Sequence, residues 1–138
     1  MNFACGALLL VLEEEEAYWG LVALVEYLFP HYYEAMVMGS MVDQTILGDM
    51  MQKRQREAYD HIEELGLELP VLTMHWFNSL FVEVIPFESL HRVFDLLLAD
   101  GREALLRVSL AFLLMNEELI LTADSFEVSC PSSLSSPH

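Results

Sequence analysis

The stretch that decides the fold is WFNSLFVEVIPFESLHRVFDLLLADG, which runs from Trp76 to Gly101. Apolar residues recur in it three and four positions apart, as they do on one face of a helix, and Pro86 divides them into two sets. The first set is Trp76, Phe77, Leu80, Phe81, Val84 and Ile85, and the second is Phe87, Leu90, Val93, Phe94, Leu97 and Leu98. The sequence therefore predicts a helix on either side of Pro86, with Asp100-Gly101 as the turn that follows.

The same spacing continues in both directions, and strictly alternating runs are scarce, so the predicted fold class is all-α. Helices are expected over residues 13–29, roughly 41–66 and 102–121, with Gly66 as a C-cap. Residues 13–29 begin with four glutamates, which favour a helix N-terminus. Their remaining positions are apolar on nearly all sides, so we expect this helix to be central and buried.

The opening run, MNFACGALLLVLEEEE, is apolar but has the features of neither a signal peptide nor a membrane anchor. No Lys or Arg occurs before Lys53, whereas a secretory signal carries positive charge ahead of its apolar run. The longest run without a charged residue, Leu69–Val82, has 14 residues, and a membrane-spanning helix needs about 18 or more. We therefore expect no direct membrane insertion.

Length and charge limit the function classes further. The 138 residues correspond to one domain by length, and their formal net charge of −16 is opposite to that of proteins that bind phosphate groups. Nucleic acid and anionic membrane surfaces are therefore excluded as expected partners, and a basic protein partner would suit the charge. The two cysteines, Cys5 and Cys130, form no recognisable framework, which favours a reduced, cytoplasmic protein.

Few residues offer catalytic or metal chemistry. Glu88 and His91 have the Glu-x-x-His spacing of di-iron helix bundles, but such a site needs two of these units and two further glutamates. A solvated helix face is the commoner explanation, and we predict no metal and no cofactor. Arg92 and Asp95 lie three residues apart on one predicted helix, where they are either a surface ion pair, a partner contact or part of a buried network.

The C-terminal residues 123–138 end in CPSSLSSPH, a Ser/Pro-rich sequence that cannot bury itself. We expect this tail to be disordered. Residues 1–122 form the predicted domain. Its 54% content of hydrophobic residues exceeds the 45 to 50% or so that is usual, which suggests apolar faces that lack a cover.

Several of these motifs, taken in order, resemble the second half of the TBC domain of Rab GTPase-activating proteins. The family pattern has an aromatic pair, a short helix, a proline, then Arg-x-aromatic-Asp before an acidic-Gly turn. The matching residues are Trp76, Phe77, Leu80, Phe81, Pro86, Arg92, Phe94, Asp95 and Gly101. Upstream, MNFACGALLLVLEEEEAYWGLVALVE, Asp43-Gln44 and Leu65-Gly66 also fit, whereas the basic segment KRQR departs from the family.

The resemblance implies a helical array like the C-terminal half of a TBC domain, and a Rab-type small GTPase as partner. Family members accelerate GTP hydrolysis with an arginine from an Ile-x-x-Asp-x-x-Arg motif and a glutamine from a Tyr-x-Gln motif. Neither motif occurs in the sequence, since the nearest match, Ile46 to Gln52, ends in glutamine where the arginine should be. The resemblance therefore implies that the chain begins in mid-domain, has no catalytic residue and is inactive alone.

The resemblance also assigns provisional roles. Trp76, Phe77, Phe81, Pro86, Arg92, Asp95 and Gly101 are expected to be structural or partner-contact residues. Self-association, or contact with the missing N-terminal half, would cover the apolar faces, and a Rab partner would bring the protein to the periphery of membranes. Two alternatives stay open, a non-catalytic helical interaction module and an iron-binding bundle that uses Glu88 and His91.

Overall fold

A computed structural model describes residues 2–34 and 38–122, and within these ranges the regular structure is entirely helical. The helices are α1 (Asn2–Leu9), α2 (Glu14–Val22), the π-helix η1 (Ala23–Leu28), α3 (Met38–Arg54), α4 (Arg56–Glu64), α5 (Leu69–Ser79), α6 (Phe87–Asp100), α7 (Arg102–Met115) and α8 (Glu117–Thr122). The all-α prediction is confirmed. Within the described ranges no helix combines the length and the apolar character needed to cross a membrane.

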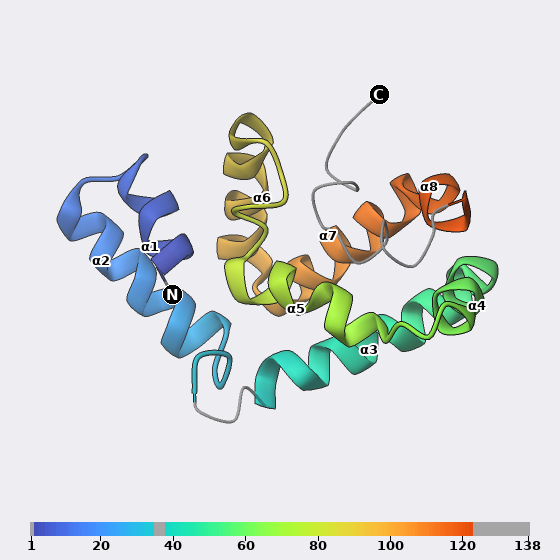
Figure 1. The fold of residues 1–138 in the computed structure, drawn as a ribbon. Helices are drawn as coiled ribbons and strands as arrows, with labels where there is room; N and C mark the ends of the chain where they lie inside the picture. Colours follow the sequence, from blue (N-terminus) through green and yellow to red (C-terminus); the bar gives the residue numbers. More distant parts are fainter. Residues whose placement is uncertain (1, 35–37, 123–138) are drawn as a thin grey trace.

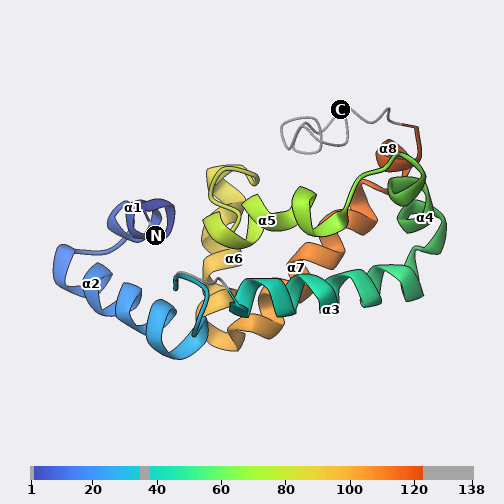
Figure 2. The same ribbon diagram turned by 60° about the horizontal axis from the view of Figure 1, so that its bottom comes forward.

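Four helices, α3, α5, α6 and α7, form the body of the molecule. α3 packs against both α5 and α7, and the three lie side by side in both ribbon views (Figures 1 and 2). α6 packs on α7, and α4 packs on α8 at the far end. The largest buried side chains of this body belong to Leu47, Met51, Trp76, Phe77, Leu97 and Leu105.

The first two helices stand at the edge of this body. α1 and α2 form a hairpin at the left of Figure 1, and α1 packs mainly on α2, while η1 provides the contact with α6. Ala4, Ala7 and Leu8 are the buried residues of α1, and Ala17 is the buried residue of α2. The α1–α2 hairpin is therefore attached to the rest of the described fold through a small part of its surface.

The expectation that residues 13–29 form a central, buried helix is half right. The segment is helical, but it begins at Glu14 and its last turn, Ala23–Leu28, widens into a π-helix. The side chains of Tyr18, Trp19 and Tyr27 are exposed, at 59, 61 and 76%. The main contacts of this helix are those of α2 with α1 and of η1 with α6, and they leave these three side chains uncovered.

The helix before Pro86 ends earlier than the sequence predicts. Apolar spacing continues to Ile85, but α5 stops at Ser79, since Leu80 and Phe81 both adopt left-handed backbone with φ of 51° and 66°. Such a conformation is unfavourable for residues with a Cβ, by roughly 1 to 2 kcal/mol each. Both side chains are fully buried, and this burial holds the backbone in place.

Two further helix boundaries differ from the expected ones. Residues 41–66 are broken at Gln55 into α3 and α4, and the predicted helix 102–121 is broken at Asn116 into α7 and α8. Met115 is 84% exposed although the residues before it are apolar, so the end of α7 is not buried all round as expected. Gly66 has φ of 73° directly after the C-cap of α4, which confirms it as the helix terminator. The predicted disordered tail, residues 123–138, lies outside the described residues.

Candidate functional site

The aromatic residues singled out from the sequence form part of the hydrophobic core. Trp76 on α5 lies with its ring centroid 5.9 Å from that of Phe81 and 5.1 Å from that of Phe112 on α7. Phe77, beside Trp76, is fully buried. These rings pack the turn after α5 onto α7, so their role in the structure is packing, and they are not accessible to a partner.

Pro86 and Gly101 mark the two ends of α6. Pro86 is the N-cap residue, with φ of −53° and extended ψ, which suits a proline immediately before a helix. Gly101 stands between α6 and α7 with φ of 58° and ψ of −131°, a conformation that is essentially restricted to glycine. A Cβ built there would also lie 3.4 Å from the side chain of Leu28. Both residues set the direction of α6.

Arg92 and Asp95 lie on the exposed side of α6. Of the explanations weighed from the sequence, the structure shows neither an ion pair between them nor a buried network. Within the described part of the chain, the ion pairs of α6 and α7 are instead those of Arg107 with Asp100 and Glu103 and of Arg102 with Asp43. Arg92 and Asp95 are thus available for contact with another molecule.

A buried charged network, which the sequence did not reveal, joins three distant segments. Asp43 on α3 is 1% exposed, and its Oδ2 atom accepts hydrogen bonds from the Tyr32 hydroxyl and from Arg102 Nε at 2.9 Å. Arg102 Nη2 donates to Asp43 Oδ1 at 2.5 Å, which completes a two-point contact with the carboxylate. The network connects the loop after η1 to the body and to the first turn of α7.

The network also shifts the ionisation of its members. Burial, followed by the hydrogen bond to Asp43, raises the pKa of Tyr32 far above its ordinary value, so the phenol stays neutral. The hydrogen bond to Asp43 raises the pKa of Arg102. Both shifts favour the protonated forms of Tyr32 and Arg102, which are the forms that donate hydrogen bonds to Asp43. Neither side chain is therefore suited to transfer protons near neutral pH.

One signal in the sequence could have revealed this network. The buried face of α3 contains polar side chains at helical spacing, Ser40, Asp43 and Gln44, followed by Leu47 and Met51. An acidic residue on the buried face of a helix needs a cationic partner. Asp43-Gln44 fits the family pattern, but neither that pattern nor helical spacing predicts which residue neutralises the carboxylate.

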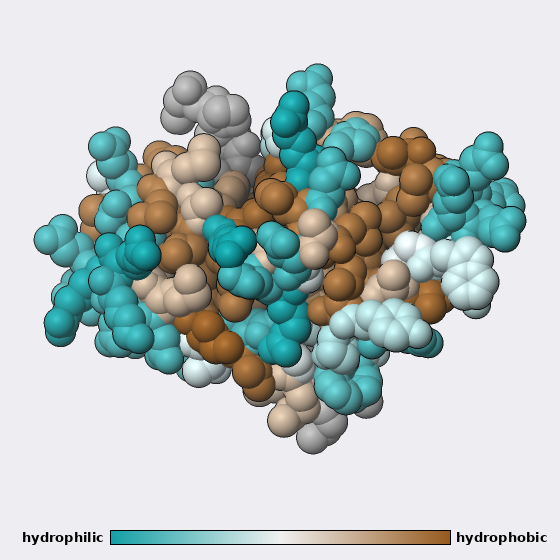
Figure 3. All heavy atoms as spheres, turned by 180° about the vertical axis from the view of Figure 1, so that it is seen from behind, coloured by the Kyte–Doolittle hydropathy of each residue, from teal (hydrophilic) through white to brown (hydrophobic). Residues whose placement is uncertain are grey.

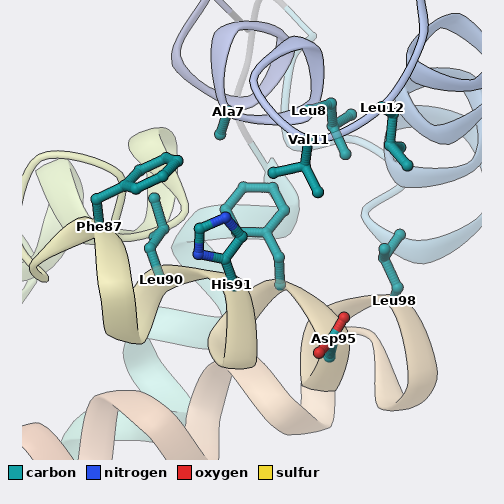
Figure 4. A pocket seen from close by; sticks show the side chains of 10 residues that line it. Ala7, Leu8, Val11, Leu12, Phe87, Leu90, His91, Asp95 and Leu98 are labelled. Atoms are coloured by element: carbon teal, nitrogen blue, oxygen red, sulfur yellow. The ribbon is translucent and has the colours of Figure 1, made fainter.

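The structure has an apolar groove between the α1–α2 hairpin and α6. Its first part is a pocket of about 100 Å³, in which side chains from α1 and the following turn face those of α6 (Figure 4). A wider hollow adjoins it beside Val82, and the two share three residues. Seen from behind, hydrophobic atoms surround the hollow beside the hairpin (Figure 3). The α1–α6 groove is defined by six apolar residues that line it, Phe3, Leu8, Val11, Phe87, Leu90 and Leu98.

Three polar residues line the groove, Asn2 on α1 and His91 and Asp95 on α6. Asp95 and His91 both line the pocket, and the His91 ring lies 4.4 Å from that of Phe87 in an edge-to-face arrangement. Among residues 2–34 and 38–122, no three His, Cys, Asp or Glu side chains form a cluster that could hold a metal ion. The groove is therefore suited to an apolar segment, with one carboxylate at its wall.

Comparison with known proteins gives the family. A model of the Rab-GTPase-TBC domain matches residues 1–121. The chain belongs to the TBC domain family. It is 36% identical to the human growth hormone-regulated TBC protein 1 over 131 residues, which are 94% of this chain and 39% of the relative. The corresponding protein of Xenopus laevis is 35% identical over 131 residues, 94% of this chain and 38% of the relative.

A solved TBC domain has the same fold. The crystal structure of the Chlamydomonas flagellar RabGAP TBC domain superposes with a TM-score of 0.81 at 28% identity, covering 94% of this chain and 43% of that one. The family and the all-α TBC fold expected from the sequence are thus confirmed. The chain spans about two fifths of the length of the curated relatives that it matches.

Proposed function

We propose that residues 1–122 are the C-terminal half of a TBC domain in a regulator of Rab-type GTPases, and that the chain does not stimulate GTP hydrolysis alone. The family match over residues 1–121 carries this proposal, because TBC domains are the GTPase-activating domains of that family. The chain matches 39% of the length of the human relative and 43% of the solved TBC domain chain. This partial match supports the assignment of the chain to one part of a domain.

The lack of activity follows from the chemistry of GTP hydrolysis. An arginine that stabilises charge on the transferred phosphoryl group contributes about 10³ to 10⁵ in rate, and a glutamine orients the attacking water. Neither the Ile-x-x-Asp-x-x-Arg motif nor the Tyr-x-Gln motif occurs in this sequence. Arg102 already donates hydrogen bonds from two of its nitrogen atoms to Asp43. It therefore makes a poor substitute for a catalytic arginine.

Arg92 and Asp95 are the charged residues of the Trp76–Gly101 pattern and both are exposed, so we assign them to partner contact. The partner is a Rab or the other half of the domain, and a Rab would bring the protein to membrane surfaces. Trp76, Phe77, Phe81, Pro86 and Gly101 are structural in this proposal. Their burial or their place at a helix end supports that role.

GTP hydrolysis assays test the proposal with two proteins. One is the 138-residue chain, and the other is a chimaera in which this chain replaces the 131 matched residues of the human relative. We expect no acceleration by the chain alone across a panel of GTP-loaded Rabs, and acceleration of at least one Rab by the chimaera. A hundredfold acceleration by the chain alone would contradict the lack of catalytic residues. A folded chimaera that accelerates no Rab would favour the non-catalytic interaction module.

A further inference from the structure

Large apolar side chains are exposed on most helices of the described chain, and one group of them lies on the first two helices and at the groove. Those of the α1–α2 hairpin and the turn between its helices are Phe3, Leu9, Leu10, Val11, Tyr18 and Trp19. Across the groove, α6 adds Phe87 at 48% and Leu98 at 38% exposure. An exposed apolar surface that lines a groove usually marks a contact with another polypeptide.

The groove has the shape and chemistry of a helix-binding site. Its two hollows share Ala7, Phe87 and Leu90, so they form one continuous depression along α1 and α6. Grooves between helices commonly accept the apolar face of a third helix. The Asp95 carboxylate at the wall has no cationic partner among the described residues, and the whole chain has a net charge of −16. An occupant with a Lys or Arg beside its apolar face would complement both features.

The unmatched part of the curated relatives indicates where such a helix would come from. Asn2 and Phe3 line the wider hollow, so polypeptide joined before them would enter directly at the groove. About three fifths of each curated relative lies outside the match. A segment held there by the chain itself has a high effective concentration, which favours it over a separate partner.

We infer that the α1–α6 groove binds a helix from the remaining part of a longer TBC chain. This helix presents an apolar face to the groove and a basic residue to Asp95. The inference rests on the proposed function, because it assigns to the other half of the domain a specific surface of this chain. It goes beyond that function in naming the groove, its polar contact and the chemistry of its occupant.

Thiol labelling tests the inference with the chimaera described above. In a background of Cys5→Ala and Cys130→Ser, Val11→Cys reports on the groove, and Met115→Cys, on an 84% exposed residue of α7, is the control. We expect Val11→Cys to react at least tenfold more slowly in the chimaera than in the 138-residue chain. The control should react at similar rates in both proteins. Replacement of Asp95 by Lys in the chimaera should increase the labelling of Val11→Cys severalfold, through repulsion of the basic residue.

The outcomes separate the inference from the proposed function. Equal labelling of Val11→Cys in both proteins, with a chimaera that accelerates Rab GTP hydrolysis, would overturn the inference and leave the proposed function standing. Slow labelling in a folded chimaera that activates no Rab would support the groove and contradict the proposed function. A chimaera that does not fold would count against the inference, because the segments of the relative would then not fit the groove.

Discussion

Trp76 is the residue on which the packing of α5 against α7 depends most, since its ring contacts both Phe81 and Phe112. Removing a buried Trp side chain costs about 3 to 5 kcal/mol through lost burial and the cavity that remains. We therefore expect Trp76→Ala to lower the free energy of unfolding by that amount. Urea unfolding followed by circular dichroism measures it.

Trp19 provides the matched control, because it is the same residue type at 61% exposure. Trp19→Ala should change the free energy of unfolding by less than about 1 kcal/mol in the isolated chain. If the Trp76→Ala change is also below about 1 kcal/mol, Trp76 does not hold the core together.

The contact of Arg102 with Asp43 gives a second prediction. Arg102→Ala leaves the Asp43 carboxylate without its counter-charge, and because Arg102 is 40% exposed and partly screened by solvent, we expect a loss of about 1 to 3 kcal/mol. Arg107→Ala, on the same helix, removes only exposed ion pairs and should cost less than about 1 kcal/mol. Thermal or urea unfolding of the two variants gives the comparison.

A second substitution separates the charge effect from the loss of side-chain packing. Asp43→Asn in the Arg102→Ala background removes the uncompensated charge, so it should recover part of the lost stability. Equal stability of Arg102→Ala and Arg107→Ala would show that the buried carboxylate does not need Arg102.

At the scale of residues, the sequence predicted the core aromatics correctly and missed the charged network. Trp76, Phe77 and Phe81 follow from helical spacing, which is a local property. The contact between Asp43 and Arg102 joins residues 59 positions apart, and a spacing rule does not reach that far. The one local indication of this contact is Asp43 itself, an acidic residue on the buried face of α3.

At the scale of elements, the sequence predicted most helices and misplaced several of their ends. The end of α5 shows why, because the apolar pattern continues through Leu80 and Phe81 while their backbone is left-handed. Side-chain periodicity reports burial, and these two residues are buried both in the predicted helix and in the observed turn. Periodicity alone therefore could not locate the helix end.

Gly101 gives a prediction at this scale. Gly101→Ala places a Cβ where φ is 58° and ψ is −131°, close to Leu28, so we expect a loss of about 1 to 3 kcal/mol in unfolding free energy. Gly6→Ala is the control, because it lies in α1 with open space around its Cβ. That change should be neutral or stabilising by up to about 1 kcal/mol. Chemical denaturation of both variants measures the difference, and a neutral Gly101→Ala would show that the α6–α7 turn can relax.

At the scale of the whole molecule, the uncovered apolar surface of the α1–α2 hairpin should control solution behaviour. Leaving about 400 Å² of such surface in water forgoes on the order of 10 kcal/mol, which is comparable with the stability of a typical domain. We expect the isolated chain to self-associate or to lose fixed packing, and light scattering over a concentration series measures the association. A monodisperse monomer at every concentration would contradict this prediction.

Two charge-introducing variants make this test specific. Leu10→Glu changes a residue that is 71% exposed on the hairpin, and Met115→Glu changes an exposed residue at the opposite end. The first should reduce self-association and the second should not. Equal effects would mean that association depends on net charge and has no defined surface.

The limited attachment of the α1–α2 hairpin has a consequence for how the chain unfolds. The body formed by α3, α5, α6 and α7 holds most of the core and the ion pair of Asp43 with Arg102, whereas α1 and α2 contribute only Ala4, Ala7, Leu8 and Ala17 to that core. Local opening free energies follow the density of such contacts. The hairpin should therefore open as a separate cooperative unit before the body does, so its amide protons would exchange with solvent first. Unfolding would then have at least two steps, and a single midpoint would not describe it.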